Sequence, residues 1–330
     1  MSKKTCAVIL AGGEGKRMKS SGPKVLSEVL FKPMLRWVID AVWDAGIDDV
    51  CVVTGSKSKF VEMFLALLPY KVDKAFQSER LGTGHAVMTA TDFLKKHSGG
   101  RTLILNGDAP FVSADTIKAV LGTDENSACT VLSAEVGDPY GYGRIVRTED
   151  GTALKAIVEE KEADDETRKI KEINSGVYCF DTDTLLDALG KLQKSPLTGE
   201  YYLTDTIEII QKSGKRVPVC KSSDSSAVLG ANDRIQLAEL NEIARMRALE
   251  MHMKNGVSIP CTDGVIIGTD VEIQHDTVIL PSTVLIGRCR IGSHCQIGPG
   301  VVLDGEIVPD ASVVQPSYTI MNRYKLPSDM

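Results

Sequence analysis

Short apolar runs alternate with amphipathic segments over residues 1–230. Three apolar runs, each ending near glycine or a polar turn, occupy positions 6–10, 50–53 and 102–105. Between them, residues 33–45 and 60–68 repeat apolar positions at helical spacing. Continuous apolar strands that alternate with helices are typical of sheets covered on both faces. The pattern therefore predicts an α/β domain with a Rossmann-like, doubly wound mixed sheet whose strands are mainly parallel.

The pattern changes twice further along the chain. From residue 131 to residue 158, polar and apolar positions alternate between turn-forming residues, which predicts a β-ribbon insertion. Residues 232–255 have helix-forming composition, and we expect a linker helix capped by Asn232 or a nearby residue and ended by Gly256. The chain then divides into a first domain at 1–230, a linker helix at 231–255 and a last segment at 256–330.

A strict repeat occupies the last segment. Aliphatic residues fall on every sixth position: Ile267, Ile273, Ile279, Leu285, Ile291, Ile297 and Leu303. This hexapeptide signature predicts a short parallel β-helix, in which three faces make a coil of about 18 residues. We expect between two and three coils, with the array ending where its phase breaks at Pro309. So short a solenoid exposes an aliphatic face, and we expect it to pack against copies of itself.

Composition excludes several classes of protein. The chain has 330 residues, and its 38 Lys and Arg against 44 Asp and Glu give a net charge of −6. An acidic chain argues against sequence-independent nucleic-acid binding, although it allows a local basic pocket. No apolar run approaches the roughly 20 residues of a membrane span. The eight cysteines are scattered, as expected of buried thiols in a reducing cytoplasm.

The strongest chemical signal follows the first predicted strand. Residues 10–18 read LAGGEGKRM, and residues 23–26 read PKVL. Glycine allows close backbone approach, so such a loop can surround a triphosphate with N–H groups while Arg17 and Lys24 add positive charge. The loop matches neither the Walker pattern nor the dinucleotide-binding fingerprint. Asp108 follows the strand at 102–105, at the sheet edge where ligands bind, and is either a metal-binding carboxylate or a turn-forming residue.

The whole set of motifs resembles the sugar-phosphate nucleotidylyltransferase family. Five further stretches narrow the likeness, and they lie at 77–86, 106–108, 141–145, 157–161 with 172–176, and 199–205. Together they resemble the uridylyltransferase half of the bacterial bifunctional enzymes that make UDP-N-acetylglucosamine. The resemblance runs in order over residues 5–235 and continues into the hexapeptide region. It implies a nucleotidyltransferase domain followed by a short left-handed β-helix that forms a homotrimer.

The resemblance also implies a reaction. An oxygen of N-acetylglucosamine-1-phosphate would attack the α-phosphorus of UTP, which gives UDP-N-acetylglucosamine and pyrophosphate. Lys24 would stabilise the charge that develops on the α-phosphate, and Arg17 would hold the outer phosphates. The sugar phosphate is already ionised near neutral pH, so no protein nucleophile is required. We therefore interpret His85 as structural.

Binding residues follow from the same resemblance. The nucleotide would contact Leu10, Ala11, Gly12, Gly13, Gln77, Gly82 and Thr83. The sugar phosphate would contact Gly143, Glu159 and Asn174. Mg²⁺ would be bound by Asp108 and Asn232, although Asn232 is open to a second interpretation as a helix cap alone.

Two departures and three alternatives accompany this interpretation. Lys16 stands where the family usually has threonine, and Asn106 stands where an aromatic residue is common. The hexapeptide array stops near Pro309, so we expect no acetyltransferase activity. The alternatives are an acyltransferase, which the short array opposes, a transferase for another base or sugar-1-phosphate, and a non-catalytic scaffold or regulator. The scaffold is opposed because Arg17, Lys24, Asp108 and Asn232 are all present.

Overall fold

The computed structural model describes residues 4–316 and divides the chain into two compact units. The first unit is Met1–Leu240 and the second is Asn241–Met330. The division falls inside helix α9 (Arg234–Lys254), which occupies most of the segment at 231–255 expected to be a linker helix. Among the described residues, no helix combines the length and the apolar character needed to cross a membrane.

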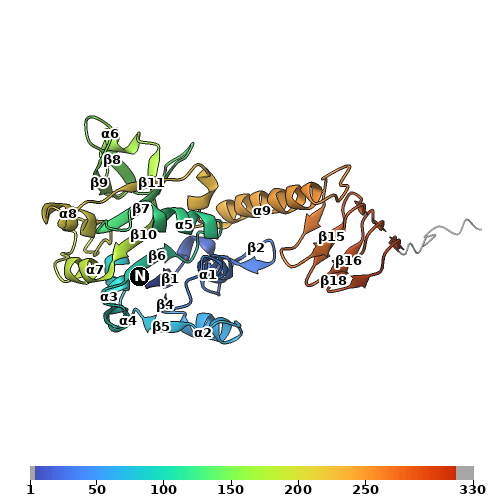
Figure 1. Cartoon of the computed structure of the whole chain (residues 1–330), viewed down its shortest axis with the longest axis horizontal. Helices are drawn as coiled ribbons and strands as arrows, with labels where there is room; N and C mark the ends of the chain where they lie inside the picture. The colour runs from blue at the N-terminus through green and yellow to red at the C-terminus, as the bar shows by residue number, and fades with distance from the viewer. Residues whose placement is uncertain (1–3, 317–330) are drawn as a thin grey trace, which may run out of the picture. The chain divides into compact units, whose positions relative to one another are not determined.

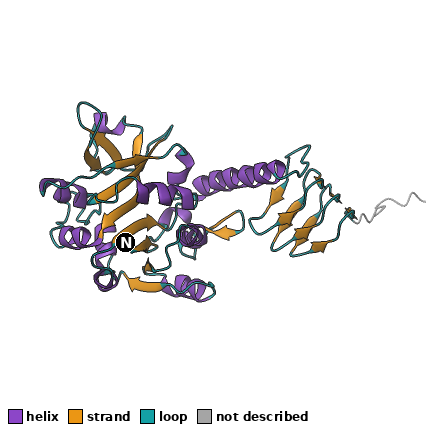
Figure 2. Ribbon diagram, in the orientation of Figure 1, coloured by secondary structure: helices purple, strands orange, loops and turns teal. Residues whose placement is uncertain are grey.

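The first unit is built on a mixed sheet whose strands run in the order β11-β7-β10-β6-β1-β4-β5, as labelled in Figure 1 and drawn as orange arrows in Figure 2. The strands are β1 Thr5–Leu10, β4 Val50–Thr54, β5 Asp73–Phe76, β6 Arg101–Asn106, β7 Cys129–Glu135, β10 Glu172–Asp181 and β11 Val219–Lys221. Strands β6, β1, β4 and β5 are parallel, whereas β10 is antiparallel to both β6 and β7. The carboxyl ends of β1, β4 and β6 therefore meet at one edge of the sheet.

Helices cover both faces of this sheet (Figure 1). One face packs against α1 Met34–Asp44, α2 Ser58–Ala66 and α5 Ala114–Gly122. The other packs against α3 Thr83–Met88, α4 Thr91–Lys96, α7 Thr182–Leu189 and α8 Asp205–Lys212. Successive strand residues point to opposite faces, so Ala7 and Ile9 enter one core while Cys6 and Val8 enter the other. The doubly wound architecture expected from the sequence is confirmed.

The remaining elements of this unit are short. They are the hairpin β2 Glu28–Val29 and β3 Lys32–Pro33, helix α6 Asp165–Arg168, and the 3₁₀ turns η1 Lys16–Met18, η2 Lys24–Leu26 and η3 Ser225–Val228. Ser113 caps α5, because its side chain accepts a hydrogen bond from the backbone N–H of Thr116.

The predicted ribbon at 131–158 is smaller than the sequence indicates. Only β8 (Arg144–Arg147) and β9 (Leu154–Val158) form it, and β7 belongs to the main sheet. The alternation in β7 misled the prediction because its polar residues Thr130 and Ser133 are fully buried. The Ser133 hydroxyl donates to Glu172 over 2.6 Å, which satisfies it inside the sheet.

Helix α9 begins after a cap that leaves Asn232 available for other contacts. The Asp233 side chain accepts hydrogen bonds from the backbone N–H groups of Ile235 and Gln236, at 3.0 and 2.9 Å. These are the donors that a helix leaves unpaired at its start. The cap is thus the neighbour of Asn232. The helix ends before Gly256, whose φ of 90° suits the turn that follows.

The second unit carries three parallel sheets of three short strands each. The strands are β12 Ile266–Ile267, β13 Glu272–Ile273, β14 Val278–Ile279, β15 Val284–Ile286, β16 Arg290–Ile291, β17 Gln296–Ile297, β18 Val302–Asp304, β19 Ile307–Val308 and β20 Val313–Val314. Ile267 pairs with Leu285, which pairs with Leu303, so each coil takes 18 residues. The repeated aliphatic residues point inward into one core. This arrangement is consistent with a short left-handed β-helix.

The array does not end at Pro309, and that prediction is wrong. Strands β19 and β20 continue the stack, because Val308 pairs with Ile291 and Val314 pairs with Ile297. The Ile291–Val308 spacing is one residue shorter than the 18 residues that join Ile273 to Ile291. A single residue lost at the corner after Leu303 thus shifts the phase without ending the coil.

Candidate active site

Two adjoining cavities open at the sheet edge where β1 and β6 end. The first, which we call the loop cavity, has a volume of about 340 Å³ and lies beside the glycine loop after β1. The second, the ribbon cavity, has a volume of about 210 Å³ and lies beside the β8–β9 ribbon. Leu10, Thr83, Asn106 and Asp108 line both cavities. The two cavities are thus halves of one site.

The loop cavity gathers most of the predicted nucleotide residues. Its lining includes Leu10, Gly12, Gly13, Lys24, Gln77, Gly82 and Thr83. The backbone is tightly packed here, because a Cβ added at Gly55 would lie 2.5 Å from the carbonyl oxygen of Gly12. Gln77 is buried, and its Nε2 donates to the Gly82 carbonyl over 3.1 Å and contacts Nδ1 of His85 at 3.2 Å. These contacts give His85 a structural role, as expected.

Lys24 joins the two predicted metal ligands. Its side chain is nearly buried, and its Nζ forms an ion pair with Oδ2 of Asp108. The same Nζ donates to Oδ1 of Asn232 over 2.9 Å. Asp108 follows β6, and Asn232 precedes α9, so three distant segments meet at one ammonium group. The interpretation of Asn232 as a helix cap alone is wrong, because Asp233 provides the cap.

The donor set fits a hard divalent cation. Mg²⁺ binds oxygen, and it typically takes one or two carboxylates and completes its shell with water and substrate phosphates. Asp108 supplies one carboxylate and Asn232 one amide oxygen, and the Lys24 ammonium already stands between them as a cation. Among the described residues, no group of three His, Cys, Asp or Glu side chains could bind a metal by itself. A metal held here would therefore depend on ligands from the substrate.

The ribbon cavity contains the three predicted sugar-phosphate residues, Gly143, Glu159 and Asn174. Burial raises the pKa of Glu159, although a 2.9 Å hydrogen bond donated by Thr204 partly offsets that effect. Asn174 donates from Nδ2 to the Tyr178 hydroxyl over 2.6 Å. The cavity thus presents carboxylate, amide and hydroxyl groups, which suit a polyhydroxylated ligand.

The structure departs from the predicted site at two positions and adds others. Arg17 is exposed in η1, and Ala11 is buried below the loop; neither is among the described residues that line the two cavities. Residues that the prediction missed also line the site: Arg80, Asn106, Tyr142, Tyr178, Glu200 and Thr204. Asn106 carried a usable signal, because it stands only two positions before Asp108.

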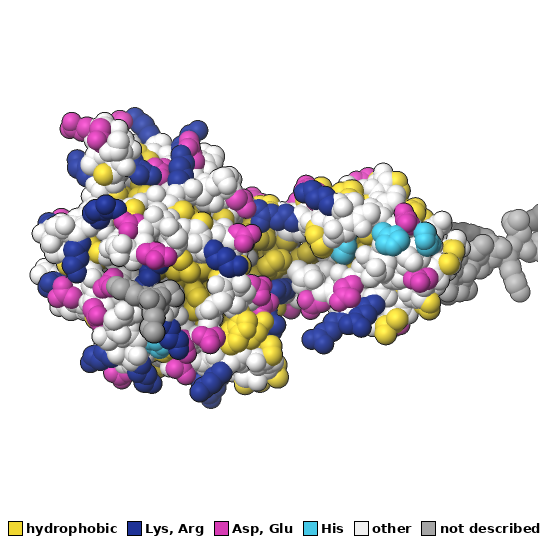
Figure 3. Space-filling model, in the orientation of Figure 1, with side chains coloured by type: hydrophobic (Ala, Val, Ile, Leu, Met, Phe, Trp, Pro, Cys, Tyr) yellow, Lys and Arg dark blue, Asp and Glu magenta, His cyan; other side chains and the backbone are white. Residues whose placement is uncertain are grey.

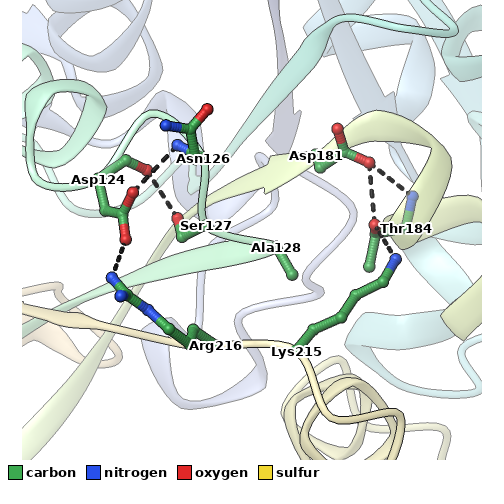
Figure 4. Close-up of a pocket in the computed structure, with 8 residues that line it drawn as sticks. All are labelled: Asp124, Asn126, Ser127, Ala128, Asp181, Thr184, Lys215 and Arg216. Carbon is green, nitrogen blue, oxygen red and sulfur yellow. Dashed lines mark hydrogen bonds and ion pairs between the residues drawn. The ribbon is translucent and has the colours of Figure 1, made fainter.

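A further cavity of about 530 Å³ lies at the opposite edge of the sheet (Figure 4). It lies beside Ala128, just before β7, and Asp181, where β10 ends. Its two cations are already engaged, because Arg216 pairs with Asp124 and Lys215 donates to Thr184 over 2.8 Å (Figure 4). The loop cavity and the ribbon cavity therefore remain the candidate active site.

Comparison with known proteins agrees with this geometry. The family model described as nucleotidyl transferase matches residues 6–225, and a model for six bacterial transferase hexapeptide repeats matches residues 270–305. The chain therefore belongs to the nucleotidyl transferase family and is a nucleotidyltransferase enzyme with a Rossmann-like mixed sheet.

Its relatives include long proteins of two functions. The chain is 48% identical over 281 residues to the bifunctional protein GlmU of Acetivibrio thermocellus, covering 84% of this chain and 60% of that protein. It is 45% identical over 286 residues to the GlmU protein of Caldanaerobacter subterraneus, covering 86% and 61%. The chain thus spans about 60% of the length of these relatives. These likenesses agree with membership of the nucleotidyl transferase family.

A solved structure shares the fold at lower identity. A Bacillus anthracis protein described as a glucose-1-phosphate thymidylyltransferase, crystallised with sucrose, superposes with a TM-score of 0.60 at 22% identity. The match covers 73% of this chain and 95% of that one. At this identity the likeness concerns the fold alone.

Proposed function

We propose that the protein transfers UMP from UTP to N-acetylglucosamine-1-phosphate, which gives UDP-N-acetylglucosamine and pyrophosphate. The observation that carries the proposal is the position of Lys24 Nζ. It contacts both Asp108 and Asn232, and Asp108 lines both cavities. A reaction between two anionic substrates needs positive charge between them, and this ammonium would supply it.

The loop cavity would bind UTP. Backbone N–H groups at Gly12 and Gly13 can approach the phosphates closely because glycine has no side chain. The Gln77 amide and the backbone at Gly82 and Thr83 offer donors and acceptors that match the edge of uracil. The hydrogen bond of 3.1 Å from Gln77 Nε2 to the Gly82 carbonyl oxygen fixes the Gln77 amide before the base binds.

The ribbon cavity would bind the sugar phosphate. Glu159 would accept hydrogen bonds from ring hydroxyls, and Asn174 would bind the acetamido group or a hydroxyl. The Asn174 amide is fixed by Tyr178 and by the backbone N–H of Gly176, at 2.6 and 3.2 Å. A ligand that meets fixed polar groups loses less free energy to ordering them.

The chemical step is a single displacement. A phosphate oxygen of the sugar phosphate forms a bond to the α-phosphorus, and the bond from that phosphorus to the pyrophosphate oxygen breaks. Lys24 would neutralise the charge that develops on the α-phosphate, while Asp108 and Asn232 would hold Mg²⁺. When bound, Mg²⁺ supplies the positive charge that screens the phosphates from each other. The nucleophile carries no proton to remove, so the residues need only orient the substrates and stabilise charge.

Other features of the chain support its expected setting. We expect a homotrimer formed through the β-helix, where Val302, Ile307 and Val313 are exposed apolar side chains. All eight cysteines are free, which supports a cytoplasmic location. On the face in Figure 3, basic and acidic side chains are interspersed, which does not favour nucleic acid as a partner.

The proposal is tested by pyrophosphate release with Mg²⁺ over a grid of substrates. UTP, dTTP, ATP, GTP and CTP are each combined with N-acetylglucosamine-1-phosphate, glucosamine-1-phosphate, glucose-1-phosphate and mannose-1-phosphate. We expect UTP with N-acetylglucosamine-1-phosphate to dominate. Another dominant pair would reject the proposed substrates, and an inactive folded protein would favour the scaffold. Incubation with acetyl-coenzyme A and glucosamine-1-phosphate tests the expected lack of acetyl transfer.

A further inference from the structure

A fully buried arginine lies directly behind the ribbon cavity. Arg144 begins β8, immediately after Gly143, and only 1% of its surface is exposed. Its Nη2 forms an ion pair with Oε2 of Glu160 at 2.7 Å. Glu160 in turn follows Glu159 directly. The pair thus joins the chain neighbours of two residues that line the cavity, Gly143 and Glu159.

Two further contacts of this pair go to the backbone of the cavity wall. Nη1 of Arg144 donates to the carbonyl oxygen of Tyr142. The backbone N–H of Gly141 donates to Oε2 of Glu160 over 3.1 Å. Gly141, Tyr142 and Gly143 therefore form a loop that is attached at two of its peptide groups to one ion pair.

The opposite side of the loop is fixed by the sheet. The carbonyl oxygen of Gly143 accepts a 2.8 Å hydrogen bond from the backbone N–H of Asn174. A Cβ added at Gly143 would lie 3.5 Å from the Asn174 Cβ and 3.6 Å from Glu159 Oε2. The three predicted sugar-phosphate residues are thus neighbours, and Gly143 and Glu159 each lie next to a member of the Arg144–Glu160 pair in the sequence.

The pair is a costly way to stabilise the fold. Buried ion pairs often contribute no more to stability than apolar residues of similar volume. The Nε of Arg144 is buried and has no hydrogen-bond partner among residues 4–316, which adds a further cost. A second cation, Arg168, lies 3.7 Å from Glu160, so the carboxylate is held from two sides. These features suit an ion pair that fixes the position of the Gly141–Gly143 loop.

We propose that Arg144 and Glu160 are positioning residues that set the affinity of the ribbon cavity for the sugar-1-phosphate. This inference rests on the proposed function. The pair touches no reacting atom. It holds the Gly141–Gly143 loop and Glu159 at the separation that the sugar ring requires. Its loss should weaken the binding of the sugar phosphate and leave the loop cavity unchanged.

A second ion pair on the same strand provides a matched control. Arg147, at the other end of β8, pairs with Glu172 through Nη2 at 2.5 Å and through Nε at 3.0 Å. Neither residue is among the described residues that line the ribbon or loop cavity. Arg147→Lys therefore removes a comparable bidentate contact from β8 without touching the loop.

The test measures KM for each substrate in wild type, Glu160→Gln, Arg144→Lys and Arg147→Lys, with thermal unfolding as a check on folding. Glu160→Gln is isosteric and keeps one acceptor oxygen while it removes the charge, so it reports even if Arg144→Lys does not fold. We expect Glu160→Gln and Arg144→Lys each to raise KM for the sugar-1-phosphate about tenfold or more, since small misplacements weaken productive binding. KM for UTP should change less than about twofold, and Arg147→Lys should change neither KM.

The outcomes separate the two proposals. An active wild type whose Glu160→Gln variant keeps its KM for the sugar-1-phosphate, or raises both KM values equally, would overturn the positioning role alone. If Arg147→Lys raised KM for the sugar-1-phosphate as much as Glu160→Gln does, the Arg144–Glu160 pair would be no more than a general structural contact. That result would also overturn the positioning role. A wild type that forms no sugar nucleotide would contradict the proposed function, and this inference would fall with it.

Discussion

Lys24 Nζ donates to Oδ1 of Asn232 over 2.9 Å, although 208 positions separate the two residues in the chain. The same ammonium pairs with Asp108 at the end of β6. The contact therefore exists only when the start and the end of the first unit have folded together. In the proposed mechanism, the same three side chains supply the charge for catalysis and the ligands for a metal.

Replacing Lys24 removes the central positive charge. We expect Lys24→Met to lower kcat by roughly 10²- to 10³-fold, because a preorganised charge aimed at the α-phosphate is lost. Steady-state pyrophosphate release measures this effect. Lys32→Met is the matched control, since Lys32 also pairs with a partly buried aspartate, Asp40. A Lys24→Met protein within a few-fold of wild type would show that Lys24 does not act on the reacting phosphate.

Asp108 and Asn232 should control the dependence on metal. We expect Asp108→Ala to lower kcat by roughly 10³-fold and chelation by EDTA to abolish activity. Asn232→Ala should raise the Mg²⁺ concentration needed for half-maximal rate by about 10- to 100-fold. Titration of Mg²⁺ at saturating substrates measures both.

The neighbouring residue Asp233 separates metal binding from helix capping. Asp233→Ala removes the α9 cap and should cost about 1 kcal/mol of unfolding free energy. Its Mg²⁺ requirement should stay near that of wild type. A shift as large as that of Asn232→Ala would mean that Asn232 acts only through the helix start.

Gly82 should tolerate no side chain. A Cβ there would lie 2.4 Å from the Tyr201 carbonyl oxygen, and φ is 100°, so the Gly82–Thr83 backbone must move. We expect Gly82→Ala to raise KM for UTP about tenfold or more. At Gly46, φ is 88° but an added Cβ would meet no described atom within 4 Å. Gly46→Ala should therefore cost about 1–2 kcal/mol of stability without changing KM.

Asp205 should make stability depend on pH. Burial, followed by the charges of Glu162 and Glu208, raises the pKa of Asp205 from 3.8 to about 6. The folded state therefore binds this proton more tightly than the unfolded chain, so the contribution of Asp205 to stability falls as pH rises from about 4 to 6. Asp205→Asn removes the titration. We expect the variant to gain about 1 kcal/mol relative to wild type between pH 4.5 and 7.5, after allowing for solvent screening.

Chemical denaturation at the two pH values checks this effect. Asp187→Asn is the control, because Asp187 is an exposed carboxylate paired with Lys191. It should show little change between the two pH values. If the unfolding free energy of Asp205→Asn fell relative to that of wild type between pH 4.5 and 7.5, the predicted sign would be wrong.

Local sequence patterns predicted what depends on near neighbours. The glycine loop, Lys24 and Asp108 follow strands whose apolar runs are unambiguous, so their shared sheet edge could be inferred. The inward aliphatic residues of the β-helix followed from their six-residue spacing. The end of the third coil was not predicted, because the loss of one residue after Leu303 shifts the phase of the six-residue pattern.

Contacts between distant segments could not be read in the same way. The Arg144–Glu160 pair joins the start of β8 to the turn after β9, and in sequence both residues are indistinguishable from solvated charges. Thr130 and Ser133 look like surface positions of a ribbon, yet they are buried because hydroxyl partners exist in the fold. Arg17 was placed by resemblance, and its exposed position away from the cavity lining leaves its role a prediction.

The most direct test of the account is the fate and stereochemistry of the α-phosphorus. The enzyme is given one diastereomer of UTP with sulfur on the α-phosphate, together with N-acetylglucosamine-1-phosphate. A single displacement guided by Lys24 predicts a sugar nucleotide that contains this phosphorus with inverted configuration. Retained configuration would show a covalent uridylyl-enzyme, and a product without the labelled phosphorus would show another reaction. Either result would contradict the account.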